Sequence, residues 1–478
     1  MRNTTKEPIA WAIASLSLPA CLSFLLQNAY HVNDAYFLGQ VGRDSMNGLG
    51  LFMMVSIANF GFILTLARGT QSLLARRLGA DNPEGAFKAL AQGLSLALRV
   101  VVPLVVLEWI FLPQILAFMG GEGATVDRAT AYLQVIFLFM PFLFAGPILE
   151  FAFQGLGDTK TPMRLQIMAV SLNTLLNWAL VLPHLVVLPF IGEVGFGGYG
   201  VVGAAVATGC SRFASSTIGF LIMARRYGDR GLLDPANYGI DVRAVREILR
   251  VGIPAGTSTL LFALVSMKVM EVMGGVGGQD AYGAYGIGFR GVESISFMLV
   301  LGIGVGTSTV AAHAVGAGLM DRARRAGHVG VGLGSIVMLA TGTLMYLYPR
   351  QLAGLYTGEE AILAIAGTYI ATMAFCQVPQ AVEMIYADAM AGAGSSARTA
   401  AITIPGNLLR WPVAWYLASV QGWGLRGVWY AILGSCLIKA VGVAALFLSG
   451  RWVKAAEHGR LFVGGAQGED LPNGATRQ

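Results

Sequence analysis

Long apolar runs recur from one end of the chain to the other, and they restrict the fold more than any other feature of the sequence. A helix that crosses the roughly 30 Å hydrocarbon core of a bilayer needs about 20 mostly apolar residues. The runs are rich in Leu, Gly and Met and do not alternate with polar residues, which favours membrane helices over a membrane barrel. The sequence predicts twelve spans, near residues 9–32, 47–67, 89–111, 130–151, 163–183, 199–223, 249–272, 283–308, 326–348, 361–389, 400–420 and 426–449.

Charged residues are too few to cover a soluble protein. They make up 12% of the 478 residues, against about 25% in soluble domains. Glycine, at 63 residues, is abundant without low complexity, which suits helices whose backbones approach closely in a membrane. These features exclude a soluble enzyme, a secreted disulfide protein and a disordered chain. The four cysteines show no CxxC pair and no metal-binding spacing. We therefore expect them to be buried and to pack like small apolar side chains; they are Cys21, Cys210, Cys376 and Cys436.

The positive charges are distributed unequally between the two sides of the predicted membrane. Of the 32 Lys and Arg residues, 22 lie at the termini and in the even-numbered loops, and only four lie in the odd-numbered loops. Loops rich in Lys and Arg stay on the cytoplasmic side. We therefore expect the protein in the cytoplasmic (inner) membrane, with both termini on the cytoplasmic side. The same distribution explains the net charge of +6 without a nucleic-acid partner.

The two halves of the chain repeat one another. Residues 17–20 match residues 252–255, and residues 155–157 match residues 392–394, in the same order and at nearly constant offset. Such a repeat indicates two pseudo-symmetric six-helix lobes, an architecture typical of transporters. Arg2 and Lys6 ahead of an apolar run are also typical of a signal peptide, but the repeat needs this run as its first helix. The predicted domains are an N-terminal lobe at 1–223, a cytoplasmic linker at 224–248, a C-terminal lobe at 249–450 and a disordered tail at 451–478.

Asp34 is the sharpest candidate for a functional group inside the membrane. Ionisable residues within spans cost roughly 2.5–3.5 kcal/mol at mid-helix, so each is a functional hypothesis. His31 lies three residues earlier in the sequence and shares a helix face with Asp34. A carboxylate in a partly dry cavity can exchange a proton or bind a cation such as Na⁺. The alternative is a carboxylate that faces water at the mouth of the helix.

Further polar residues within the spans are weaker candidates. Glu383 shows no local partner in the sequence and ranks after Asp34. Lys268 with Glu271, and Arg290 with Glu293, are spaced three apart and are expected to form structural ion pairs. Pro19 removes a backbone hydrogen bond from the first helix and predicts a kink. The polar residues suited to a cavity wall, or alternatively to hydrogen bonds between helices, are Asn173, Asn177, Thr208, Gln380 and Asn407.

No motif for chemical catalysis or nucleotide binding is present. The sequence has no GxxxxGK[ST] run that would bind ATP, no HExxH and no GxSxG. We therefore predict no catalytic residues, no metal centre and no cofactor, and a protein that is not an enzyme.

Several motifs together resemble the multidrug and toxic compound extrusion (MATE) family. Residues 33–42 resemble the end of its first helix, and Gln71 with residues 78–82 resembles its loop after the second. Residues 154–163, Gln-Gly-Leu-Gly-Asp-Thr-Lys-Thr-Pro-Met, are close to its signature before the fifth helix, and residues 200–208 resemble the start of the sixth. The resemblance covers residues 9–450 and both halves.

The resemblance implies twelve helices in two lobes and export of organic, often cationic compounds in exchange for H⁺ or Na⁺. By the resemblance, Pro19 and Asp34 correspond to the proline and the carboxylate of the first helix, Asn173 to the asparagine of the fifth and Thr208 to the threonine of the sixth. Two departures leave the coupling ion open. Asn177 stands where one subgroup has an aspartate, and Gln380, with Glu383 one turn on, stands near the acidic position of another.

The sequence thus predicts an all-α integral membrane protein that works as a secondary active multidrug efflux antiporter by alternating access. Its expected partners are small organic substrates and the lipid bilayer, and the expected state is a monomer. The alternative is a flippase for lipid-linked sugars, which would need a cationic cavity for pyrophosphate; Lys268, Arg290 and Arg410 are the residues on which it rests.

Overall fold

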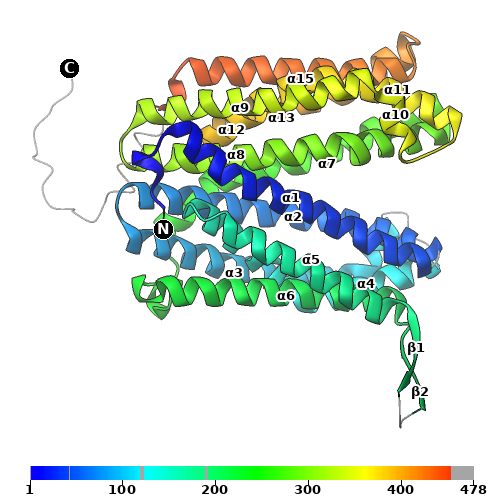
Figure 1. The fold of residues 1–478 in the computed structure, drawn as a ribbon, viewed down its shortest axis with the longest axis horizontal. Helices are drawn as coiled ribbons and strands as arrows, with labels where there is room; N and C mark the ends of the chain where they lie inside the picture. The colour runs from blue at the N-terminus through cyan, green and yellow to red at the C-terminus, as the bar shows by residue number, and fades with distance from the viewer. Residues whose placement is uncertain (1, 42, 119–122, 189–191, 454–478) are drawn as a thin grey trace, which may run out of the picture.

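The computed structural model describes residues 2–41, 43–118, 123–188 and 192–453. Long antiparallel helices form two lobes that lie against one another (Figure 1). The N-lobe comprises α1 to α6, and the C-lobe comprises α7 to α15. We call the end at which the N-terminus lies the basal end and the opposite end the distal end.

In the N-lobe, six long helices alternate in direction. Most extend beyond their predicted spans, because the polar residues at the ends of these helices continue the helix outside the apolar stretch. They are α1 (Ile9–Val41), α2 (Arg43–Gly79), α3 (Pro83–Phe118), α4 (Ala124–Gly155), α5 (Lys160–Val181) and α6 (Gly200–Tyr227). Pro19 lies within α1, which contains Asp34 well inside its distal half.

The C-lobe repeats this plan with more breaks in its helices. A left-handed backbone at Gly278 interrupts α7, and a π-helical segment leads into α8. The predicted tenth and eleventh spans are each divided, the tenth at residues 374–376 and the eleventh at Leu409. The elements are α7 (Val242–Tyr285), η4 (Gly286–Glu293), α8 (Ser294–Gly316), α9 (Met320–Leu347), α10 (Pro349–Gly354), α11 (Glu360–Met373), α12 (Gln377–Gly392), α13 (Ser396–Leu408), α14 (Arg410–Trp415), η6 (Tyr416–Val420) and α15 (Leu425–Leu448).

A β-hairpin is the one departure from helix that the apolar pattern did not predict. Strands β1 (Pro183–Leu188) and β2 (Gly192–Gly197) pair antiparallel and project at the distal end between α5 and α6 (Figure 1). The predicted fifth span, 163–183, ends at Pro183, the first residue of β1. Gly197 and Gly198 both adopt positive φ at the end of the hairpin, a backbone that glycine accepts without strain.

Seven helical segments among the described residues are long and apolar enough to cross a membrane. One of them, residues 242–316, contains both α7 and α8. The apolar segments are distributed over both lobes, and large hydrophobic side chains such as Leu138, Ile336 and Val441 are exposed on the outside of the bundle. A bundle with an apolar outer surface is stable in lipid rather than in water. The protein is therefore a multi-pass membrane protein.

The lobes are joined mainly by α1 against α8 and by α2 against α7 and α8. Glycines make this approach possible, because a Cβ atom on Gly69 would overlap the backbone of Ile248, and one on Gly316 would overlap the backbone of Arg76. We call this contact region the basal seam. It lies at the basal ends of α1, α2, α4, α7, α8 and α12.

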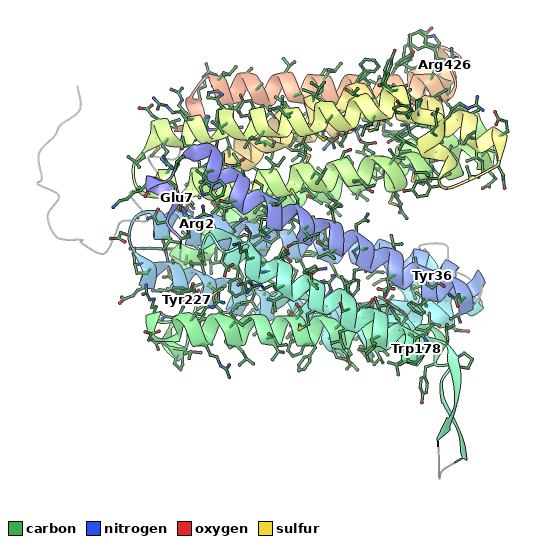
Figure 2. All side chains as sticks on the ribbon, in the orientation of Figure 1. Arg2, Glu7, Tyr36, Trp178, Tyr227 and Arg426 are labelled. Carbon is green, nitrogen blue, oxygen red and sulfur yellow. The ribbon has the colours of Figure 1, made fainter. Side chains whose placement is uncertain are left out.

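Residues 2–8 lie across the basal seam. The short helix η1 (Thr4–Lys6) precedes α1, and Arg2 and Glu7 lie beside one another there (Figure 2). The backbone N–H of Arg2 donates to the Leu156 carbonyl of the N-lobe at 3.1 Å. Thr4 is fully buried, and its Oγ1 lies 3.1 Å from Nδ1 of His313 in the C-lobe. The N-terminal segment thus contacts both lobes.

Candidate functional site

Asp34 is buried inside the N-lobe, where two helices, α5 and α6, direct hydrogen-bond donors at it. Its side chain is only 7% exposed. Oδ1 accepts from Asn173 Nδ2 at 3.0 Å and from Asn177 Nδ2 at 2.7 Å, and Oδ2 accepts from Thr208 Oγ1 at 3.1 Å. Asn173 and Asn177 are four residues apart on α5, so they lie on one face of that helix. The Asp34 carboxylate is therefore buried and does not face water at the mouth of the helix.

A second layer of polar contacts holds these donors in place. Asn33 Nδ2 donates to Asn173 Oδ1 at 2.7 Å, which fixes the amide orientation that points the Asn173 nitrogen at Asp34. On the other side, the Tyr30 hydroxyl lies 2.6 Å from Ser211 Oγ, one turn after Thr208. The Arg212 guanidinium stacks over the Tyr30 ring at 4.3 Å. It therefore lies beside the site without forming an ion pair with Asp34 among the described residues.

The donor set suits a proton or a hard monovalent cation. The cluster contains a carboxylate, two amides and a hydroxyl, whose oxygens are ligands that hard cations prefer. In this structure the two amides present their nitrogens to Asp34. Asn177 Oδ1 is buried and has no hydrogen-bond partner, although buried polar atoms are normally paired. The nitrogen of the same amide donates to Asp34, so this oxygen lies at the other end of the amide from the carboxylate contact. No cluster of three His, Cys, Asp or Glu side chains occurs in the described part of the chain.

The other two predicted site residues lie elsewhere. Glu383 and Gln380 belong to α12 in the C-lobe. The sequence shows no local partner for Glu383, but the structure provides one. Lys439 of α15 approaches its Oε1 at 3.0 Å, and both side chains are at most 10% exposed. A Cβ atom at Gly406 would collide with the Lys439 side chain, so a glycine makes room for the lysine. The buried amide oxygens of Gln377, Gln380 and Asn407 have no partner.

Of the two predicted structural ion pairs, one forms and the other does not. Lys268 Nζ lies 2.7 Å from Glu271 Oε2. Glu293 instead accepts a hydrogen bond from the Tyr369 hydroxyl at 2.6 Å, and no described ion pair joins it to Arg290. The reason is that η4 is π-helical over both residues, so spacing by three does not place them on one face.

Sequence reasoning missed the charges that join the lobes. Arg68 Nη1 of α2 lies 2.8 Å from Asp388 Oδ1 of α12, and Arg76 Nη2 lies 3.4 Å from Glu247 Oε2 of α7. Ser72 Oγ, between the two arginines on α2, donates to the Ala391 carbonyl at 2.8 Å. The one available signal was the spacing of Arg68, Ser72 and Arg76 by four, which predicts a shared helix face but not its partner helix.

The fold and this site define a class: a multi-pass helical membrane transporter of two lobes, with a polar cluster buried in one of them. The model of the MatE family matches residues 19–179 and 254–416, one segment in each lobe. The chain belongs to the MatE family.

Relatives and solved structures agree with this assignment. The "Probable multidrug resistance protein NorM" of Thermotoga maritima is 27% identical over 93% of each chain. The protein of the same description from Pseudomonas aeruginosa is 28% identical over 91% of this chain and 88% of its own. A crystal structure of MATE in complex with MaL6 superposes with a TM-score of 0.86 at 22% identity, covering 96% of this chain and all of the other. An outward-facing multidrug resistance MATE family transporter gives 0.85 at 22% identity over 96% of this chain and 99% of its own.

Proposed function

We propose that this protein is a secondary active multidrug efflux antiporter, which exports small organic and often cationic compounds in exchange for H⁺ or Na⁺. The proposal is supported by relatives described as multidrug resistance proteins that align over nearly their whole length. No step of such transport requires a catalytic residue or a bound cofactor, and the coupling ion is a transported substrate.

The buried Asp34 carboxylate is the observation that carries the proposal. Three side chains donate to its two oxygens, and no ion pair neutralises it among the described residues. A carboxylate that binds H⁺ or Na⁺ in this pocket loses its negative charge. The charge of the pocket therefore depends on ion occupancy, which is what exchange of an ion for a cationic substrate requires.

Coupling also requires two states of the lobes. In this proposal the basal end is cytoplasmic, because both termini and most Lys and Arg residues belong to that side. The basal seam then closes the cytoplasmic entrance, and rocking of the lobes would open it. The ion and the substrate must each stabilise a different state of the lobes. A ligand that binds both states with equal affinity does not shift the equilibrium between them. The protein is proposed to act as a monomer in the inner membrane.

Two of the three cations on which the flippase alternative rests have partners of their own. Lys268 is paired with Glu271, and Arg410 donates to Ser435 and stacks over Phe262. Arg290, the third, forms no ion pair among the described residues, and the multidrug function is favoured by the relatives.

The test is gradient-driven efflux of a fluorescent lipophilic cation from proteoliposomes that contain the full chain. An imposed proton gradient and an imposed sodium gradient are applied separately. We expect efflux under one of them and its loss in Asp34→Asn. The matched control is Asp127→Asn, because Asp127 is an exposed aspartate at the distal start of α4. Efflux that persists unchanged in folded Asp34→Asn contradicts the proposal.

A further inference from the structure

A partly buried ion pair joins the two lobes across the basal seam, in addition to the pair of Arg76 with Glu247. Arg68 of α2 and Asp388 of α12 are 2.8 Å apart, and their side chains are 11% and 15% exposed. The two residues are 320 positions apart in the sequence and belong to lobes that contact one another. The pair therefore exists only while the lobes touch at the basal end.

The guanidinium of Arg68 is itself an organic cation held by an aromatic ring and a carboxylate. Its central carbon lies 5.1 Å from the centroid of the Phe151 ring on α4, an arrangement that attracts cations. On the other side, α8 approaches Asp388 so closely that a Cβ atom at Gly304 would overlap Oδ2. Phe151 belongs to the same lobe as Arg68. When the lobes part, Arg68 stays with its ring, and Asp388 is left on the C-lobe without a cation.

A buried carboxylate that loses its partner is costly unless water or another cation replaces it. We infer that Asp388 binds the positive charge of an organic cation when the basal seam is open, and that Arg68 occupies this carboxylate when the seam is closed. This inference rests on the proposed function and adds to it a second substrate-contacting carboxylate, separate from Asp34 of the other lobe.

The competition has a direct consequence for transport. A cationic substrate that replaces Arg68 on Asp388 stabilises the state in which the seam is open. Reciprocally, removing Arg68 must strengthen binding of the cation, because the coupling between two ligands for one site is the same in both directions. Removing Asp388 must weaken it. The two partners of one ion pair thus have opposite effects on the binding of a cation.

Opposite signs separate this role from that of a mechanical latch. A latch that only holds the lobes together is broken equally by Arg68→Gln and by Asp388→Asn, so both variants would shift binding in the same direction. We therefore propose equilibrium binding to the purified full-length protein in lipid nanodiscs. The probes are tetraphenylphosphonium, a monovalent organic cation, and triphenylphosphine oxide, a neutral compound of similar shape.

For the cation, we expect binding about tenfold tighter in Arg68→Gln and about tenfold weaker in Asp388→Asn, a conservative size for a partly buried charge pair. For the neutral compound, we expect both variants to shift in the same direction. Equal shifts for the cation in the two variants, or no shift in either, overturn the inference. Arg68→Lys and Asp388→Glu keep the charges and can be used where a neutral variant fails to fold. Asp388→Glu should still bind the cation, and loss of cation binding in this variant also overturns the inference.

The outcome is independent of the antiport test. Absence of gradient-driven efflux in the wild type, together with opposite shifts in cation binding, removes the proposed function and leaves the cation site. Gradient-driven efflux without opposite shifts removes only the assignment of Asp388.

Discussion

At the scale of single residues, the C-lobe pair of Glu383 and Lys439 shows how much a buried charge depends on its partner. Both side chains are buried, and they lie 3.0 Å apart. Lys439→Met leaves the Glu383 carboxylate without a counter-charge, so we expect a loss of about 3–5 kcal/mol in the free energy of unfolding. Chemical denaturation in detergent, followed by tryptophan fluorescence, measures this loss.

The double variant Lys439→Met with Glu383→Leu is the control for that prediction. It removes both charges and fills the space with apolar atoms, so it should recover most of the stability. A double variant as unstable as Lys439→Met would show that the methionine does not fit beside Gly406, and that charge is not the cause.

Also at this scale, Thr208→Val tests the hydrogen bond to Asp34. Valine keeps the shape of the side chain but removes the hydroxyl that donates to Oδ2 at 3.1 Å. A hydrogen bond to a charged group contributes about 1.5–3 kcal/mol, so we expect the concentration of coupling ion for half-maximal efflux to change by about tenfold or more. Ser211→Ala, which changes a neighbouring hydroxyl that bonds Tyr30 and not Asp34, should change it less.

At the scale of elements, the N-terminal segment stabilises the closed basal seam from outside the bundle. Arg322 of α9 donates to the carbonyls of Thr4 and Glu7, and His313 bridges Thr4 and the Gly155 carbonyl of α4. We expect deletion of residues 2–7 to increase the fraction of molecules with an open seam. Labelling of Ser72→Cys by a maleimide, in a background without the four native cysteines, measures it. Unchanged labelling would mean that α2, α7 and α8 alone hold the seam.

The anchoring of this segment should depend on pH. The hydrogen bond from Arg2 lowers the pKa of the Glu7 carboxyl below its ordinary value. A carboxyl whose pKa is lowered on folding contributes stability above its unfolded pKa, about 4.3 for Glu. That contribution is lost as the pH falls through the lower folded value. We expect the fraction of molecules with an open seam to rise below about pH 4.3, as measured by pulsed electron resonance between spin labels on the basal ends of the two lobes. Glu7→Gln should remove this rise, and a rise that persists would assign it to another carboxyl.

At the scale of the whole molecule, glycines set how closely the lobes can approach. A side chain at Gly316 would overlap the backbone of Arg76 across the seam, so Gly316→Val should force the basal ends apart. Spin labels on the distal ends of the two lobes should then move closer, as measured by pulsed electron resonance. The control is Gly332→Val, because nothing lies within 4 Å of an added Cβ at Gly332. An unchanged distance in the Gly316 variant would exclude a rigid rocking motion.

The sequence predicts the architecture of the whole molecule better than it predicts contacts between side chains. Apolar runs of membrane length and the repeat between the halves predict two helical lobes, because lipid imposes helix length and backbone pairing. Polar residues within apolar spans singled out Asp34, Asn173, Asn177 and Thr208, whereas only the family resemblance assigned Asn173 and Thr208 to one site with Asp34. The ion pairs could not be predicted, since they depend on which helices pack together and on how each helix is rotated about its axis. This holds for Glu383 with Lys439 and for Arg68 with Asp388.

The ion pair across the seam also bears on how the transporter behaves when no drug is present. If the basal end is cytoplasmic, as proposed, each opening of the empty protein there separates Arg68 from Asp388 with no substrate cation to take the place of Arg68. Empty molecules would therefore cycle rarely, and ions would not leak inward through futile turns of the carrier. A cell could then hold many copies of this pump in its membrane without draining the gradient on which its other transporters depend.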